Sequence, residues 1–89
     1  MHHIESAQQY CTSAELGDIN AQFTLALMYA NGLGGLTEDC IHAHKWASMS
    51  AMNGNTEAAM LAELLAQQMT RQEIESSRKL ILQCRSNKL

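Results

Sequence analysis

The sequence is poor in aromatic and β-branched residues, and this scarcity weighs against a fold built from β-sheets. Its 89 residues include one tryptophan, one phenylalanine and two tyrosines, whereas methionine occurs six times. Small and unbranched apolar side chains, alanine above all, suit close packing between helices. With 46% hydrophobic and 17% charged residues, the chain has the composition of one small folded domain covering residues 1–89. We therefore expect an all-α fold.

Disulfides and membrane segments are also not expected. The three cysteines, Cys11, Cys40 and Cys84, form an odd set, and no C-x-x-C motif is present. A reducing compartment fits this usage best. No stretch approaches the roughly 20 apolar residues that cross a bilayer. The opening MHHIESAQQY lacks the apolar run of a signal peptide. The expected protein is cytoplasmic and has no membrane partner, although a processed fragment of an exported protein would have the same features.

Basic residues are nearly absent from the first 70 positions, which hold Lys45 against seven acids and so carry a charge of −6. Residues 71–89 reverse the sign, with five basic residues against Glu73 and Glu75, a charge of +3. This balance argues against a nucleic-acid partner, which needs a clustered basic face. It fits a solvated helix whose cations lie toward its C-terminus, and it leaves open head-to-tail docking or an acidic partner.

Apolar residues at helical spacing predict a first pair of helices. Residues 4–16 carry one stripe, formed by Ile4, Ala7, Tyr10, Cys11 and Ala14. Gly17 is placed to end that helix, and Asp18 is placed to cap the next one over residues 19–31. Because the turn between them is short, the two helices are expected to be antiparallel.

Three more helices are expected after a glycine-rich loop. Thr37 is predicted to cap the third helix, with the two acids that follow it in the first turn, and this helix ends near Met52. Asn55 then caps a fourth helix, whose apolar stripe covers residues 58–69. The sequence of residues 70–73 matches a capping box. It opens a fifth helix whose buried candidates are Ile74, Leu80, Ile81 and Cys84.

A repeat with an offset of 37 residues relates the two predicted helix pairs. Ser13, Ala14, Gly17, Ala21 and Leu27 recur as Ser50, Ala51, Gly54, Ala58 and Leu64. A period of this size in helical hairpins is typical of an α-solenoid. We expect two hairpins of about residues 4–36 and 37–69, stacked as a right-handed superhelix and closed by a capping helix of about residues 70–85. Trp46 is expected to fill the space between the hairpins.

The same positions resemble the Sel-1-like repeat family, relatives of the tetratricopeptide repeats. Residues 14–34 follow the pattern A-x-x-G-x-x-x-A-x-x-x-L-x-x-x-Y-x-x-G-x-G, and an acid, A-x-x-W and a small pair come next as Asp39, Ala43, Trp46 and Ser50-Ala51. The departures are an inserted Gly35, Thr37 in place of a common proline, Gln9 at the first tryptophan position, and Ala66 and Met69 at the end of the second unit. The resemblance implies an α-α superhelix that mediates protein–protein interaction, often in bacterial signalling, envelope or host-contact pathways.

The predicted function is therefore that of a non-enzymatic adaptor that binds another protein or a peptide. In such a module the first helix of each hairpin should line the inner face. The predicted partner-binding residues are Glu5, Gln8, Thr12 and Glu15 in the first unit, and His42, Lys45, Met49 and Met52 in the second. The methionines suit this role because their side chains adapt to varied partners. The alternative is that these residues are merely exposed or pack on the closing helix.

Two alternative functions remain open. A structural homodimer would bury an unfinished edge of the solenoid. A metal site would use Cys40 and His44, one helical turn apart, with His2 or His3, but zinc needs three or four ligands. Cys11 and Cys84 lack a histidine–acid partner at a readable spacing, and the glycine-rich loop lacks the Lys-Ser/Thr of a phosphate loop. No catalytic residue, metal or cofactor is expected.

Overall fold

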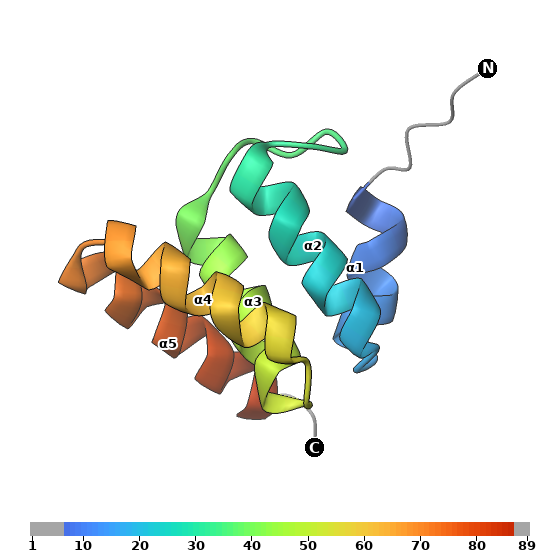
Figure 1. The fold of residues 1–89 in the computed structure, drawn as a ribbon. Helices are drawn as coiled ribbons and strands as arrows, with labels where there is room; N and C mark the ends of the chain where they lie inside the picture. Colours follow the sequence, from blue (N-terminus) through green and yellow to red (C-terminus); the bar gives the residue numbers. More distant parts are fainter. Residues whose placement is uncertain (1–6, 87–89) are drawn as a thin grey trace.

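Five α-helices make up the part of the chain that the computed structural model describes, residues 7–86, and no strand occurs among them. In chain order they are α1 (Ala7–Glu15), α2 (Ile19–Asn31), α3 (Cys40–Met52), α4 (Thr56–Gln68) and α5 (Arg71–Ser86). Helices α1 and α2 form one hairpin, α3 and α4 form a second, and α5 lies beside the second, as Figure 1 shows. The all-α prediction is confirmed.

Helix α3 lies at the centre of this arrangement. It packs against α2, α4 and α5, whereas α1 packs mainly on α2 (Figure 1). As a result α3 has more buried residues than its neighbours, and they point in several directions around its axis: Ala43, His44, Lys45, Trp46, Ala47, Met49 and Ser50. The contacts of α3 therefore connect the first hairpin to the rest of the chain.

The two hairpin turns have the same local structure. The Asp18 side chain accepts a hydrogen bond from the Ala21 amide at 3.0 Å, and the Asn55 side chain accepts one from the Ala58 amide at 3.0 Å. The preceding glycines have positive φ angles, +100° at Gly17 and +111° at Gly54, which glycine adopts without a Cβ clash. Helices α2 and α4 each contain 13 residues. These local features confirm the predicted caps and turns.

The third helix begins later than the sequence suggested. Asp39, not Thr37, is its N-cap: one oxygen of the Asp39 carboxylate accepts from the amides of Ile41 and His42, at 3.0 and 3.1 Å. The Asp39 amide also donates to the Tyr29 carbonyl at 2.9 Å, which fixes this residue against the end of α2. Thr37 is exposed in the loop. Aspartate is a strong N-cap, and here the position of α2 selects it over the earlier threonine.

Trp46 lies in the core, as predicted. It is buried with residues of both hairpins, in a cluster with Ala7, Ala14, Ala21, Leu25, Ala26, Met28, Ala47 and Met49. Of the alanines that recur at the 37-residue offset, Ala14, Ala21 and Ala58 are buried, which allows the helices to pack closely, whereas Ala51 is only partly buried. The apolar surface that α1 and α2 remove from water is thus covered largely by α3, and the hydrophobic effect holds the hairpins together.

Polar groups also connect the hairpins. The Gln22 side chain is fully buried and donates to the Ala14 carbonyl at 3.0 Å, while its oxygen accepts from the Asn53 side chain at 3.2 Å. The Ser50 hydroxyl donates to the Ile19 carbonyl at 2.9 Å. Buried polar groups stabilise a fold only when they are hydrogen-bonded, and these bonds meet that condition while fixing the register of α3 against the first hairpin.

Helix α5 begins with the predicted capping box. The Glu73 amide donates to the Thr70 hydroxyl at 3.1 Å, and the Thr70 amide donates to the Glu73 carboxylate at 2.9 Å. The four apolar residues expected to be buried on this helix, Ile74, Leu80, Ile81 and Cys84, are partly buried. Among the helices described, α5 included, none combines the length and apolar character that a membrane crossing requires.

Candidate functional site

The α1 half of the predicted binding face is exposed. Gln8, Thr12 and Glu15 are spaced by four and three positions, so their side chains share one side of α1, and each is exposed. Glu5, the fourth residue predicted for this face, lies outside the described residues. The described part of this face offers hydrogen-bonding groups and one negative charge.

The α3 half differs from the prediction. Lys45 and Met49 were expected to point outward, but they are only 9% and 5% exposed. The Lys45 ammonium lies 4.1 Å from the centroid of the Trp46 ring, and Met49 belongs to the core cluster. Helical spacing correctly identified residues that share one face of α3. However, α2, α4 and α5 together cover most of the surface of α3, so part of that face is buried as well.

His42 and Met52, the other two predicted residues of α3, remain accessible. The His42 ring stacks on Tyr29 of α2, with centroids 5.1 Å apart, and its Nδ1 lies 2.8 Å from the Asp39 carboxylate. Burial raises the pKa of Asp39, but the hydrogen bonds from the His42 amide and ring outweigh it and leave the pKa below its ordinary value. Asp39 therefore stays ionised and holds the His42 ring in place. Met52 stands exposed at the end of the helix.

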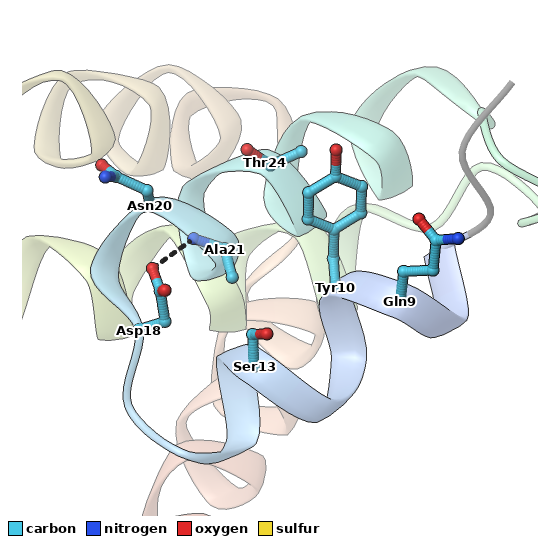
Figure 2. A pocket seen from close by; sticks show the side chains of 7 residues that line it. All are labelled: Gln9, Tyr10, Ser13, Asp18, Asn20, Ala21 and Thr24. Atoms are coloured by element: carbon cyan, nitrogen blue, oxygen red, sulfur yellow. Dashed lines mark hydrogen bonds between the residues drawn. The ribbon is translucent and has the colours of Figure 1, made fainter. Parts of the chain in front are cut away.

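A shallow hollow of about 260 Å³ lies on another side of α1, between α1 and α2. Figure 2 shows the Tyr10 ring rising from α1 beside Thr24 of α2, with Ser13 and Asp18 nearer the turn. The full lining is Gln9, Tyr10, Ser13, Asp18, Asn20, Ala21 and Thr24. The walls offer amide, hydroxyl and carboxylate groups beside the Tyr10 ring, so this hollow provides both hydrogen-bonding groups and apolar contact.

The 37-residue repeat relates this hollow to a surface of the second hairpin. Gln9, Tyr10 and Thr24 correspond to Trp46, Ala47 and Leu61, which are buried or partly buried in or against the core that the hairpins share. Ser13 corresponds to Ser50, whose hydroxyl reaches Ile19 across the hairpin interface. The second hairpin packs against the first hairpin with the surface that corresponds to this hollow. In the hollow itself, polar Gln9 and Thr24 stand in place of apolar Trp46 and Leu61. The 37-residue offset was the sequence signal that could have located it.

A polar seam joins α3 to α5. The Cys40 thiol donates to the Glu73 carboxylate at 3.5 Å, and one turn further along both helices His44 Nδ1 lies 2.7 Å from the Ser77 hydroxyl. Cys40 and His44, weighed above as metal ligands, thus each have a partner on α5. No group of three or more histidine, cysteine or acidic side chains suited to a metal occurs within residues 7–86, and His2 and His3 lie outside the described residues.

The stability of the protein is expected to fall in mild acid because His44 is buried in this seam. Burial, followed by the Arg78 charge, lowers the pKa of His44 below its ordinary 6.5. The unfolded chain therefore binds this proton more readily, so the free energy of unfolding should be level above about pH 6.5 and should decrease as the pH falls toward the folded-state pKa. Urea denaturation between pH 8 and pH 5 measures the effect, because histidine side chains usually titrate within about this pH interval.

The His44→Gln variant supplies the control for this pH dependence. Glutamine keeps a hydrogen-bonding group opposite Ser77 but does not titrate. The difference in unfolding free energy between wild type and variant should change with pH, wild type losing more stability below pH 6.5. Parallel curves across the whole range would contradict the assignment of this titration to His44.

The Cys40 thiol is expected to react slowly. Burial, followed by the hydrogen bond to the Glu73 carboxylate, raises the pKa of Cys40 and keeps it protonated at neutral pH. Glu73→Gln should speed alkylation of Cys40 by iodoacetamide a few-fold, since it removes the negative charge while an amide oxygen can still accept from the Thr70 amide. Glu75→Gln, on the exposed side of the same helix, is the matched control. Peptide mass spectrometry separates Cys40 from the other thiols, and equal rates in the two variants would contradict the prediction.

No protein-family model matches the sequence, and a search of curated proteins finds no match.

Proposed function

We propose that this chain is a protein-binding module of two repeated helical hairpins, with no chemistry of its own. The observation that carries the proposal is the recurrence of one set of turn hydrogen bonds 37 positions apart. Gly17 donates to Ala14 and Asp18 to Ser13, and the amides of Gly54 and Asn55 donate in the same way to Ala51 and Ser50. Because the length of α2 and the type of its N-cap recur in α4 as well, the hairpins are best explained as copies of one unit.

The resemblance to Sel-1-like repeats extends this proposal from architecture to function. A repeated hairpin resembling that family is expected to form part of an α-α superhelix whose helices present a surface to another protein chain. The tyrosine of the family pattern, Tyr29, supports His42 on the proposed face, and the tryptophan, Trp46, is at the centre of the core. Both residues therefore have structural roles that a binding scaffold requires.

The proposed binding face consists of exposed groups on α1 and α3. Gln8, Thr12 and Glu15 supply its polar part, His42 a half-exposed ring held by Asp39, and Met52 an adaptable apolar contact. Lys45 and Met49 lie beneath the surface, where they shape the face without being exposed on it. An apolar anchor beside polar groups is the usual composition of a peptide-binding surface, and the proposed partner is a peptide or helix of another protein.

The compartment is proposed from the thiols. Cys11, Cys40 and Cys84 are free, and burial, followed by the Glu15 carboxylate, also raises the pKa of Cys11. Unpaired thiols are usual in a reducing compartment, which supports a cytoplasmic location. A bacterial origin is proposed on the resemblance to Sel-1-like repeats alone.

Selection from a library of random peptides tests the proposed function. The immobilised protein should enrich peptides that share an anchor pattern, and calorimetry should give dissociation constants in the range of about 1–100 μM for a small interface. Thr12→Arg and Met52→Gln should each weaken binding about tenfold, because they alter the polar and the apolar part of the face.

The matched control is Leu27→Gln, which also replaces an exposed apolar side chain but lies on α2. It should leave the affinity within about twofold of wild type, since surface substitutions outside an interface have small effects. Equal weakening by Met52→Gln and Leu27→Gln, or the absence of any enriched peptide, would contradict the proposal.

A further inference from the structure

We propose that two copies of this chain associate through α4 and α5, with α4 of each copy packed against α5 of the other in a two-fold dimer. This goes beyond the binding of a foreign peptide, because it uses different helices and a different partner. The inference starts from exposed apolar side chains on the last two helices, Met60 and Leu64 on α4 and Leu82 on α5.

Helix α4 carries an exposed apolar pair with acidic neighbours. Met60 and Leu64 are 65% and 57% exposed and lie one turn apart on the side that faces away from α3. Glu57 and Glu63 are exposed beside them, and no basic residue occurs on this helix. The outer side of α4 is therefore apolar at its middle and negatively charged at its borders, an arrangement that a solvated helix does not require.

Helix α5 carries the opposite charge around a similar centre. Leu82 is 63% exposed, and Arg78 and Lys79 lie one turn before it on the outer side of the helix. Arg71 is exposed on the same helix, so the exposed residues described on α5 carry three positive charges and one negative charge, that of Glu75. An apolar residue with basic neighbours on α5 thus matches an apolar pair with acidic neighbours on α4.

The positions of the two helices make this match usable by a second copy. Both follow the first hairpin and are joined through Met69 and Thr70, and they lie at the same end of the molecule (Figure 1). In a two-fold dimer any contact between α4 and α5 of different copies occurs twice. In the proposed dimer the acidic outer side of α4 in each copy faces the basic outer side of α5 in the other, and both apolar centres are covered.

The other end of the molecule does not offer the same match. At the hollow between α1 and α2, polar Gln9 and Thr24 stand where the second hairpin has Trp46 and Leu61. Covering that surface with another copy would bury these hydrogen-bonding groups, which costs free energy unless each group finds a partner. The edge predicted from the sequence for a homodimer is therefore assigned to the α4–α5 end.

Sedimentation velocity with wild-type protein tests association first. The protein should sediment as a monomer at about 1 μM and as a dimer at several hundred micromolar. Salt should shift the equilibrium toward monomer, because the Debye length falls from about 14 Å to about 3 Å as the ionic strength rises from about 0.05 to 1 M. A monomer at every concentration, or growth beyond the dimer, would overturn the proposal.

Two charge-reversed variants test the pairing of helices. Glu57→Lys with Glu63→Lys makes α4 basic, and Arg78→Glu with Lys79→Glu makes the outer side of α5 acidic. Each variant alone should lose dimerisation by about tenfold or more in dissociation constant, because like charges then face each other. A mixture of the two should dimerise again, since both contacts between unlike copies join opposite charges. Loss of dimer in the mixture would overturn the assignment of α4 to α5.

A control separates local pairing from net charge. Glu38→Lys changes the net charge as much as Glu63→Lys does but lies in the exposed loop before α3. It should leave the dimerisation constant within about twofold, whereas Glu63→Lys alone should weaken it measurably. Equal effects of the two would overturn the proposal. Circular dichroism confirms that each variant is folded, and peptide binding by the α1–α3 face, measured at 1 μM, is independent of the outcome.

Discussion

Trp46→Ala is expected to abolish the fold. The indole is buried among residues of α1, α2 and α3, so its removal leaves a cavity at the contact that joins the hairpins. Large-to-small substitutions of this kind cost about 3–5 kcal/mol. A domain of this size has a total stability of about 5–10 kcal/mol, so the variant should be largely unfolded or should melt far below wild type. Far-UV circular dichroism during heating measures both outcomes.

Trp46→Phe is the control for this prediction. It keeps an aromatic ring in the same site and should lose only part of the stability, because a smaller cavity remains. The order of melting temperatures is therefore expected to be wild type, then phenylalanine, then alanine. A Trp46→Ala variant that melts within a few degrees of wild type would show that the indole does not hold the hairpins together.

Gln22→Ala is expected to cost about 2–4 kcal/mol, since it combines a cavity with unmet hydrogen bonds. The amide of Gln22 is fully buried, donates to the Ala14 carbonyl of α1 and accepts from the Asn53 side chain that follows α3. Removal leaves the Ala14 carbonyl without this donor inside the protein. Urea denaturation gives the change in unfolding free energy.

Gln67→Ala is the matched control, because it deletes the same atoms from an exposed position of α4. Its effect should be within about 0.5 kcal/mol. A double-mutant cycle with Asn53→Ala isolates the bond between Gln22 and Asn53, and the two changes should not be additive. Additive effects, or equal losses at positions 22 and 67, would contradict the role given to Gln22.

The sequence predicted best those features that local chemistry determines. Asp18 and Asn55 cap their helices, Gly17 and Gly54 adopt positive φ, and residues 70–73 form a capping box, because each signal acts within four positions along the chain. The burial of Trp46 also followed from the sequence, since the chain has no other side chain of that size for its core. The prediction that Thr37 caps α3 was wrong. The Asp39 amide donates to the carbonyl of Tyr29, ten positions earlier, and this contact helps to select Asp39 as the cap.

The candidate site was predicted less well, because tertiary packing decides exposure. The spacing of Lys45, Met49 and Met52 places them on one face of α3. Only Met52 is exposed, because the helices packed on α3 cover the other two. Gln22 carries no sequence signal of burial, since its partners come from α1 and from the turn after α3. The His44–Ser77 contact likewise depends on where α5 packs, which periodicity does not determine.

Mapping of a selected peptide by nuclear magnetic resonance tests the central claim most directly, that the exposed face of α1 and α3 binds another protein chain. Titration of the ¹⁵N-labelled protein should shift the amide signals of Gln8, Thr12, Glu15, His42 and Met52, and leave those of the hollow between α1 and α2 and of the outer side of α4 nearly unchanged. Shifts centred on either of those other surfaces, or none at a peptide concentration of about 1 mM, would contradict the account.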